Sequence, residues 1–510
     1  MNILDCTLRD GGYYNNWNFS LNLIRKYFSL IGKINIKYIE IGFRFPNKAS
    51  KMGLTAYSED NFINNLKISK KIKVGIMINA SDFINNDKVD IVLLKKTFPN
   101  NNNLNFVRVA CHAGQIFKIK PIIKYLKKKF IVMINLMQIS EVNKKELKKI
   151  IYFINKLGIK VFYIADSLGA LKPEHIYKIL KLLKNEINCE IGIHAHDNLG
   201  FAYKNSMVAS YNGALWIDST INGMGRGAGN LKTEKILRLD KSKKKLLNSF
   251  IKKNFEKLKK KYKWGKNIYY NLAGKYKIHP TYIQNLLNEN RTKYINLKKI
   301  ILNLRKIGAK KYNPLNLYFS LKIFSKKNLN SFGYHKFFKD KKILILGSDS
   351  LKKMKKKIEN KIKIENFYVI TLNNNFEINK KFQNLRVICH PLRLLSFEAK
   401  NKKFNTPIVA PFFSINKSLR SKLFSEKVKI LNYGIELSNN HSIKIYKNYL
   451  STNDPLALTY ILSILNLAKV REINLAGFRA YKNDDYHKDN SEKIFGYFSK
   501  KIKFKKLYLN

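Results

Sequence analysis

The sequence contains few cysteines and no long apolar run, and each shortage excludes a class of protein. Only 4 of the 510 residues are cysteines, and they lie far apart, at Cys6, Cys111, Cys189 and Cys389. This excludes a disulfide scaffold and paired zinc-type cysteines. No apolar run approaches the length of about 18 residues that a membrane-spanning helix needs. The first residues show no basic segment followed by an apolar one, so no signal peptide is predicted. We therefore expect a soluble, cytoplasmic protein without membrane association.

Acidic residues are also scarce. The chain has 34 Asp and Glu against 98 Lys and Arg, which gives a net charge of +64. Such a charge raises nucleic acid as a partner. However, lysine is spread along the whole chain with many Asn and Ile and only 10 Pro, as an AT-rich coding sequence would produce. The lysine runs at 127–129, 243–245 and 355–357 lack the interleaved aromatics of a stacking platform. We interpret the charge as drift and expect no nucleic-acid partner.

Residues 1–240 show eight short apolar runs that alternate with longer helical patterns. The runs are 3–8, 38–43, 73–78, 106–110, 130–136, 160–165, 190–194 and 215–221. Repeated strand–helix units predict a parallel sheet with right-handed crossovers. Eight such units in this length predict a (β/α)₈ barrel, an α/β fold, as the catalytic domain.

Two further domains are predicted after the barrel. Residues 241–335 carry lysine-rich helical patterns, which predict a helical extension packed on the barrel. Residues 336–510 alternate short strands and helices, which predicts a Rossmann-like α/β domain of unknown role. Its first strand leads into Gly347-Ser348-Asp349-Ser350, either a phosphate-binding turn or a generic α/β turn, because the dinucleotide fingerprint is incomplete.

Polar residues gather where the predicted barrel strands end. They are Arg9 and Asp10 at the first strand, Asp166 and Ser167 at the sixth, His194 and His196 at the seventh, and Asn222 at the eighth. The carboxyl ends of barrel strands build the active site in this fold. The sequence therefore predicts one site at this end of the barrel.

His194 and His196 are two residues apart at a strand end, so their side chains point the same way. Two such imidazoles can bind one divalent cation, although a packed or hydrogen-bonded pair is the alternative. Asp10 would add a carboxylate ligand and Arg9 a fixed positive charge. An ordinary buried Arg–Asp ion pair is the alternative there.

The third element is a glycine-rich loop, Asn222-Gly-Met-Gly-Arg-Gly-Ala-Gly-Asn230. Its four alternate glycines allow the backbone to approach a ligand closely. Loops after the seventh and eighth strands of such barrels often bind anions. A plain flexible loop is the alternative.

Together the three elements resemble the DRE-TIM metallolyase superfamily, the HMG-CoA-lyase-like or pyruvate carboxyltransferase group. The resemblance covers about residues 1–235 and includes Ala165-Asp166-Ser167-Leu168-Gly169, which looks like the sixth-strand motif. Within the superfamily, the chain is most similar to the 4-hydroxy-2-oxovalerate aldolases. The resemblance implies a metal-dependent carbon–carbon lyase acting on a 2-oxo acid such as pyruvate, and self-association or a partner enzyme.

The resemblance also implies roles for individual residues. It places Mn²⁺ or Mg²⁺ on Asp10, His194 and His196, with Asn230 as a further ligand. It gives Arg9 the task of stabilising an enolate. It places Ser167 and Arg226 beside the substrate.

One residue departs from the aldolase pattern. Tyr13 stands where these aldolases carry a histidine base, and a phenol with a pKa near 10 is a poor base at neutral pH. Tyr13 is then expected to orient a hydroxyl or act as an acid, on a substrate that differs from 4-hydroxy-2-oxovalerate. The alternatives are a Claisen-type acyltransferase of the isopropylmalate or homocitrate synthase kind, whose Glu-Gln after the glycine is absent, and a basic nucleic-acid-binding or scaffold protein with an inert barrel.

Overall fold

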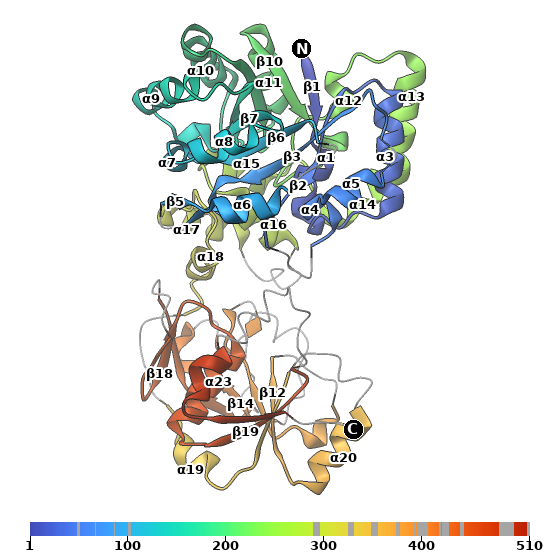
Figure 1. The fold of residues 1–510 in the computed structure, drawn as a ribbon. Coiled ribbons are helices and arrows are strands. Elements are labelled where there is room, and N and C mark those ends of the chain that lie inside the picture. Colours follow the sequence, from blue (N-terminus) through green and yellow to red (C-terminus); the bar gives the residue numbers. More distant parts are fainter. Residues whose placement is uncertain are drawn as a thin grey trace. The chain divides into compact units, whose positions relative to one another are not determined.

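The structure is a computed structural model of the chain (Figure 1). It describes residues 1–47, 52–66, 68–85, 87–99, 104–288, 296–324, 331–347, 355–373, 378–391, 393–394, 406–417, 420, 428–438, 443–478 and 494–506. The chain divides into two compact units. The first is Met1–Asn288 with Gly308–Tyr312, and the second is Glu289–Ile307 with Asn313–Asn510.

The first unit contains a closed barrel of eight parallel strands, which confirms the predicted fold class. The strands are β1 (Asn2–Asp5), β2 (Tyr38–Phe43), β3 (Lys73–Asn79), β6 (Phe106–Cys111), β7 (Ile131–Leu136), β8 (Val161–Asp166), β9 (Glu190–Ala195) and β10 (Ala214–Ser219). They are hydrogen-bonded in the order β1-β10-β9-β8-β7-β6-β3-β2, and β2 closes the barrel against β1. The carboxyl ends of all eight strands therefore meet at one rim.

The first strand ends earlier than the apolar run 3–8 predicts. The Asp5 carboxylate accepts hydrogen bonds from the backbone N–H of Thr7 (3.0 Å) and from its hydroxyl (2.6 Å). This turns the chain into the short helices α1 (Thr7–Asp10) and α2 (Gly12–Asn15). The prediction that Arg9 and Asp10 end the strand was therefore wrong. They lie on a helical turn that covers the strand end.

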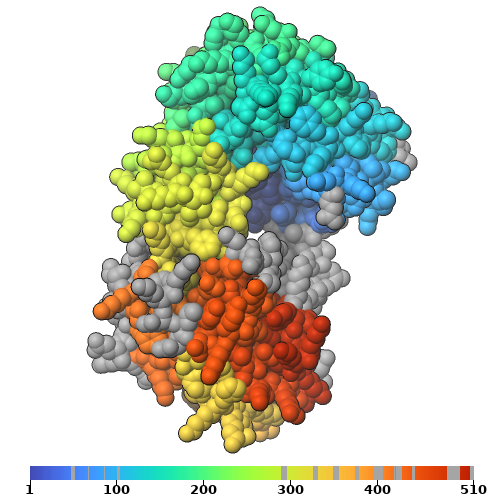
Figure 2. Space-filling view, turned by 90° about the vertical axis from the view of Figure 1, so that its left-hand side faces the viewer, coloured from blue at the N-terminus to red at the C-terminus, as the bar shows by residue number. Residues whose placement is uncertain are grey.

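Helices cover the outside of the barrel. In α9 (Lys144–Asn155) the buried residues Leu147, Ile150, Ile151 and Ile154 recur at helical spacing, and the Asn143 side chain accepts from the N–H of Glu146 at the first turn. Figure 2 shows the outer surface of this unit in cyan and teal, where α8 (Lys120–Leu126), α9 and α10 (Pro173–Glu186) hide the strands.

The chain after the barrel continues as helices that contact the rim loops. These are α13 (Lys241–Phe250), a π-helical segment (Ile251–Phe255), α14 (Glu256–Tyr262), α15 (Ile268–Lys275) and α16 (Pro280–Asn288). In α16, Gln284 donates to the carbonyl of Tyr13 (2.8 Å) and accepts from the N–H of Gly227 (3.3 Å). One side chain thus joins α16 to the loops that follow β1 and β10.

The second unit is an α/β domain, as predicted. Within the described residues, its main sheet has seven parallel strands, in the order β15 (Ile430–Asn432), β14 (Ile408–Ala410), β13 (Leu385–Val387), β12 (Tyr368–Leu372), β11 (Ile343–Leu346), β19 (Glu472–Ala476) and β20 (Lys503–Lys506). A separate small sheet contains β16 (Gly434–Leu437), β18 (Tyr449–Thr452) and β17 (Lys444–Ile445), and β17 runs antiparallel to β18. The buried helix α23 (Ala457–Leu467) contributes to its core. The turn at 348–350, a candidate phosphate site from the sequence, lies outside the described residues.

The helices that the structure describes include none that is both long and apolar enough to cross a membrane.

Candidate metal centre and active site

Three charged side chains from three strands meet inside the barrel. Glu40 on β2, Arg108 on β6 and Asp218 on β10 are all fully buried. Arg108 donates from Nε to Glu40 Oε1 (2.7 Å) and from Nη1 to Asp218 Oδ2 (2.7 Å). The Arg108 guanidinium also stacks over the Tyr163 ring, 4.4 Å from its centroid. Buried charges are stable only when paired in this way, so the three residues form a fixed polar platform.

Arg9 extends this platform towards the rim. Its Nε donates to Glu40 Oε2 (2.6 Å) and its Nη1 to Asp10 Oδ1 (2.7 Å). Its Nη2 lies 3.9 Å from Asp218 Oδ2 and makes no hydrogen bond among the described residues. The guanidinium is therefore held from two sides and keeps one NH₂ group available to a ligand.

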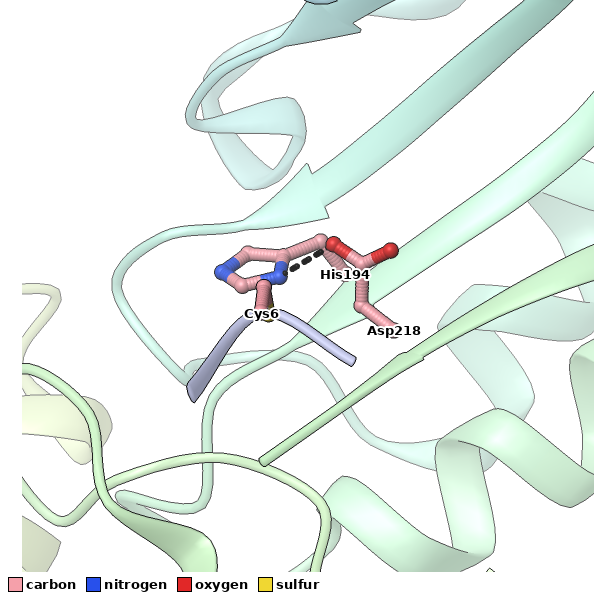
Figure 3. Close-up of side chains that lie close together, drawn as sticks. All are labelled: Cys6, His194 and Asp218. Carbon is pink, nitrogen blue, oxygen red and sulfur yellow. Dashed lines mark hydrogen bonds and ion pairs between the residues drawn. The ribbon is translucent and has the colours of Figure 1, made fainter. Parts of the chain in front are cut away.

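Asp218 also fixes the first histidine. Its Oδ2 lies 2.8 Å from Nδ1 of His194, as the dashed line in Figure 3 shows. The other ring nitrogen, Nε2, points away from Asp218 and lies 3.8 Å from Asp10 Oδ2 and 3.3 Å from Asn230 Nδ2. A carboxylate behind the far nitrogen is the usual way in which a metal-binding histidine is oriented.

The structure brings the three predicted metal ligands together. Potential donor atoms of Asp10, His194 and His196 lie within 4.8 Å of one another, and all three side chains are buried. Within the part of the chain that the structure describes, Asp10 Oδ2 and Asn230 Oδ1 are buried without any hydrogen-bond partner. Unpaired buried oxygens are costly and need an explanation. Two imidazoles and these oxygens fit a divalent cation such as Mn²⁺ or Mg²⁺.

The protonation states of His196 and Asp10 suit metal binding. Burial lowers the pKa of His196 to about 3, although the negative charge of Asp10 opposes this effect. Burial alone would raise the pKa of Asp10, but the positive charge of Arg9 and the nearby histidines outweigh it and hold the pKa well below its usual value. A neutral imidazole and an ionised carboxylate are the forms that bind metal.

Cys6, His194 and Asp218 form a second close cluster (Figure 3). Burial raises the pKa of the Cys6 thiol well above its usual value, and the thiol donates to the carbonyl of Ser219 (3.5 Å). Only a thiolate is a good metal ligand, and Nδ1 of His194 is already engaged by Asp218. We therefore interpret this cluster as support for His194.

The glycine-rich loop, residues 222–230, packs directly against the proposed metal ligands. His196 and Asn230 pair through their backbones, and His196 Nδ1 lies 3.2 Å from the carbonyl of Arg226. A Cβ atom at Gly225 would collide with Asn230 Oδ1 and with Asp10 Oδ2. Glycine at position 225 therefore allows the loop to lie directly against the ligands, as the sequence pattern predicts.

The other predicted site residues lie around this centre. The Arg226 guanidinium sits 5.0 Å from the Tyr13 ring centroid, and its Nε has no hydrogen-bond partner among the described residues. Burial raises the pKa of Tyr13, so its phenol stays protonated. Ser167 follows β8, and its Oγ accepts from the N–H of Gln138 (3.1 Å). In the described structure, no hydrogen bond joins Ser167 to the metal ligands.

Two histidines near Arg226 were missed by the sequence reasoning. His112 directly follows β6, and burial, with the charges of Lys311 and Arg226, lowers its pKa to about 4. His279 precedes α16, and burial, with the charges of Arg226 and His196, lowers its pKa well below the usual value. Both imidazoles are thus neutral at pH 7. A histidine directly after a predicted strand was a usable signal for His112.

Glu40, Arg108 and Asp218 were also missed. Each is a lone charged residue inside a run that predicts a buried strand, as in Phe106-Val-Arg-Val-Ala110. Charged residues are almost never fully buried unless they are paired. This pattern alone could have identified them as an internal network.

A closed parallel barrel with two histidines and a carboxylate gathered at its rim defines a metal-dependent TIM-barrel enzyme. The sequence model of the HMGL-like family matches residues 1–256, which is half of the 510-residue chain. The chain belongs to the HMGL-like family.

The chain is similar to curated enzymes over its first half. It is 28% identical over 239 residues to a 4-hydroxy-2-oxovalerate aldolase from Brevibacillus brevis, covering 46% of this chain and 68% of that protein. It is 25% identical over 235 residues to an oxaloacetate decarboxylase from Mycobacterium tuberculosis, covering 46% and 67%. Among solved structures, the N-terminal domain of a candidate aldolase from Bacteroides vulgatus is 32% identical, with 56% of this chain and 96% of that chain covered and a TM-score of 0.49.

These relatives confirm the predicted enzyme class, a carbon–carbon lyase, at the level of the family. The alternative of an inert barrel would leave the convergence of Asp10, His194 and His196 without a reason.

Proposed function

We propose that the first unit is a divalent-metal-dependent aldolase or lyase that makes or breaks a carbon–carbon bond next to a 2-oxo acid. The observation that carries this proposal is the meeting of Asp10, His194 and His196 beside the available NH₂ group of Arg9. Breaking such a bond leaves its electron pair on the 2-oxo acid as an enolate. A site for this reaction needs positive charge at the keto oxygen, and this arrangement supplies it.

Asp10, His194 and His196 would hold the cation, with Asn230 Oδ1 as a further oxygen beside it. Mn²⁺ or Mg²⁺, when bound, supplies Lewis-acid chemistry at the substrate oxygens. The carboxylate of Asp218 holds His194 in the required orientation and tautomer.

Arg9 is the proposed stabiliser of the enolate. Burial within the ion pairs to Glu40 and Asp10 keeps the guanidinium charged and immobile, and its Nη2 remains available. Because the group is already in place, no reorganisation is needed as negative charge develops on the substrate.

Arg226, Tyr13 and Ser167 are the proposed substrate-binding groups. Arg226 Nε lacks a partner among the described residues and can pair with the substrate carboxylate. The Tyr13 phenol stays protonated and so can donate a hydrogen bond. Ser167 Oγ already accepts from Gln138, which leaves its own proton for a substrate oxygen.

His112 and His279 are the proposed proton-handling groups in place of the family's base. The N–H of Thr281 donates to His279 Nδ1 (3.4 Å), so Nε2 of the neutral ring carries the proton and can donate to a substrate oxygen. His112 is neutral at pH 7 and can therefore accept a proton, although its lowered pKa makes it a weaker base than an exposed imidazole. We therefore assign hydrogen-bond donation to His279 and general-base work to His112.

The test is exchange of the pyruvate methyl protons with deuterium, followed by NMR, together with metal content. We expect Mn²⁺-dependent exchange in the parent and loss of both metal and exchange in Asp10→Ala and His194→Ala. The control is Asp240→Ala, because Asp240 is an exposed helix cap. A parent chain that binds no metal and exchanges no protons would refute the proposal for pyruvate. Product formation only with acetyl-CoA would instead support the Claisen-type alternative.

A further inference from the structure

A second cavity lies beside the glycine-rich loop. Its volume is about 310 Å³, and it is lined by the start of α11 (Ala202–Tyr211), by the loop residues 222–223, 228 and 230–232, and by Lys259 of α14 with the segment 264–266 that follows. Neither Asp10 nor His194 lines it. The Asn230 side chain lies against His194, and Gly225 lies against Asp10, so the loop forms a wall between the two sites.

The charge of this cavity is unbalanced. Four lysines line it, namely Lys232, Lys235, Lys259 and Lys266. Among the described residues, none of the four makes an ion pair within 4.0 Å, whereas many other lysines of this chain do. The one carboxylate in the lining, Asp197, accepts from the N–H of Ala202 at the start of α11.

Two of the lysines are half-buried and close enough to repel each other. Burial and the charge of Lys232 lower the pKa of Lys259, while the charges of Glu234 and Glu256 partly oppose them. Holding like charges together in a hollow costs free energy unless an anion joins them.

The walls are shaped for close approach of a compact ligand. Gly200 (φ +82°), Gly223 (φ +65°) and Gly265 (φ +122°) line the cavity with bare backbone in a conformation that side chains disfavour. The Trp264 indole donates to the carbonyl of Asn222 (3.0 Å) and holds the loop in place.

We propose that this cavity binds a phosphate group. Four lysines without an ion pair within 4.0 Å among the described residues, against one carboxylate in the lining, match a compact dianion, and lysine serves as a point-charge phosphate ligand. The cavity lies at the loops after the seventh and eighth strands, where barrels of this type frequently bind phosphate. The phosphate belongs either to a phosphorylated substrate or to a free effector. Binding does not depend on the proposed lyase reaction.

The experiment measures inorganic phosphate binding by calorimetry at physiological ionic strength. The cavity variant is the double change Lys232→Met with Lys259→Met. The matched control is Lys244→Met with Lys245→Met, which removes the same charge from the exposed face of α13. We expect binding to weaken on the order of tenfold or more in the cavity variant and to change little in the control. Thermal unfolding of both variants checks that they fold.

Equal weakening in both variants would overturn the proposal, because the binding would then reflect only the net charge of the protein. Absence of phosphate binding by the parent would also overturn it. Two further measurements distinguish a free phosphate effector from the phosphate group of a substrate. If the phosphate is a free effector, inorganic phosphate changes the rate of pyruvate exchange in the parent and not in the cavity variant. If it belongs to the substrate, exchange is unaffected, and inorganic phosphate competes with a phosphorylated aldehyde. Failure of the lyase reaction itself would remove exchange but leave phosphate binding intact.

Discussion

Asp218 Oδ2 lies 2.8 Å from Nδ1 of His194, the ring nitrogen that faces away from Asp10, and the same oxygen accepts from Arg108 Nη1 at 2.7 Å. Asp218→Asn keeps the shape but weakens the acceptor, so His194 loses its fixed tautomer. We expect Mn²⁺ affinity to fall by about 10–100-fold, measured by calorimetry. Asp240→Asn should leave it unchanged. Unaltered affinity in Asp218→Asn would mean that the pair is only structural.

Arg9→Lys should separate charge from geometry. A lysine keeps the positive charge but cannot reach Glu40, Asp10 and the substrate together, so we expect the turnover number for pyruvate exchange to fall by about 10²–10³-fold at saturating metal. The KM for pyruvate should change less. Arg25→Lys on the exposed side of α3 (Leu21–Lys33) is the control. A rise in KM with unchanged turnover would assign Arg9 to substrate binding instead.

The two histidines should respond differently to replacement by glutamine. A glutamine amide can donate a hydrogen bond but cannot take up a proton at neutral pH. We therefore expect His279→Gln to recover much of the pyruvate exchange that is lost in His279→Ala. In His112→Gln we expect the exchange rate to fall by about 10²–10⁴-fold. The reverse pattern would exchange the two roles.

Gly225→Ala should damage the metal centre although it replaces none of the proposed ligands. The added Cβ would meet Asn230 Oδ1 and Asp10 Oδ2, which must then move. We expect metal binding and exchange to be lost together. Gly114→Ala, where a Cβ would meet nothing within 4 Å, is the matched control and should behave as the parent. Full activity in Gly225→Ala would show that the loop is not held against the ligands.

Asp166 should make the unfolding free energy depend on pH. Burial raises its pKa to about 6, although the N–H groups of Ala170 and Leu171 partly oppose this. Because the folded-state pKa is raised, the stabilisation is fully present below about pH 4 and is lost as the pH rises through 6. The difference over this window is about 3 kcal/mol.

Urea unfolding at several pH values tests this prediction. The variant Asp166→Asn should lose that part of the slope between pH 4 and pH 7, while Asp87→Asn at an exposed position should keep it. Parallel curves for the parent and Asp166→Asn would contradict the prediction.

The barrel was predictable from the sequence because its signals are local. The run 38–43 matches β2 at both ends, and His194 and His196 report their shared direction through strand periodicity alone. The first strand was misjudged because the Asp5 side chain, rather than apolar periodicity, decides where it ends.

The rest of the site depends on contacts between residues far apart in the sequence. His279 comes to Arg226 only because Gln284 joins α16 to Tyr13 and Gly227, and no local pattern encodes that contact. The lysine cavity was hidden for a different reason. In a chain with 98 basic residues, four of its lysines give no sequence signal until their positions in the fold are known.

The buried network has a consequence for electroneutrality. Glu40, Asp10 and Asp218 contribute three negative charges, and Arg9, Arg108 and Arg226 contribute three positive ones, so these six side chains are neutral together. A divalent cation would give the centre two positive charges, and a 2-oxo acid monoanion would reduce them to one. A bound cation therefore favours the binding of an anionic substrate beside it.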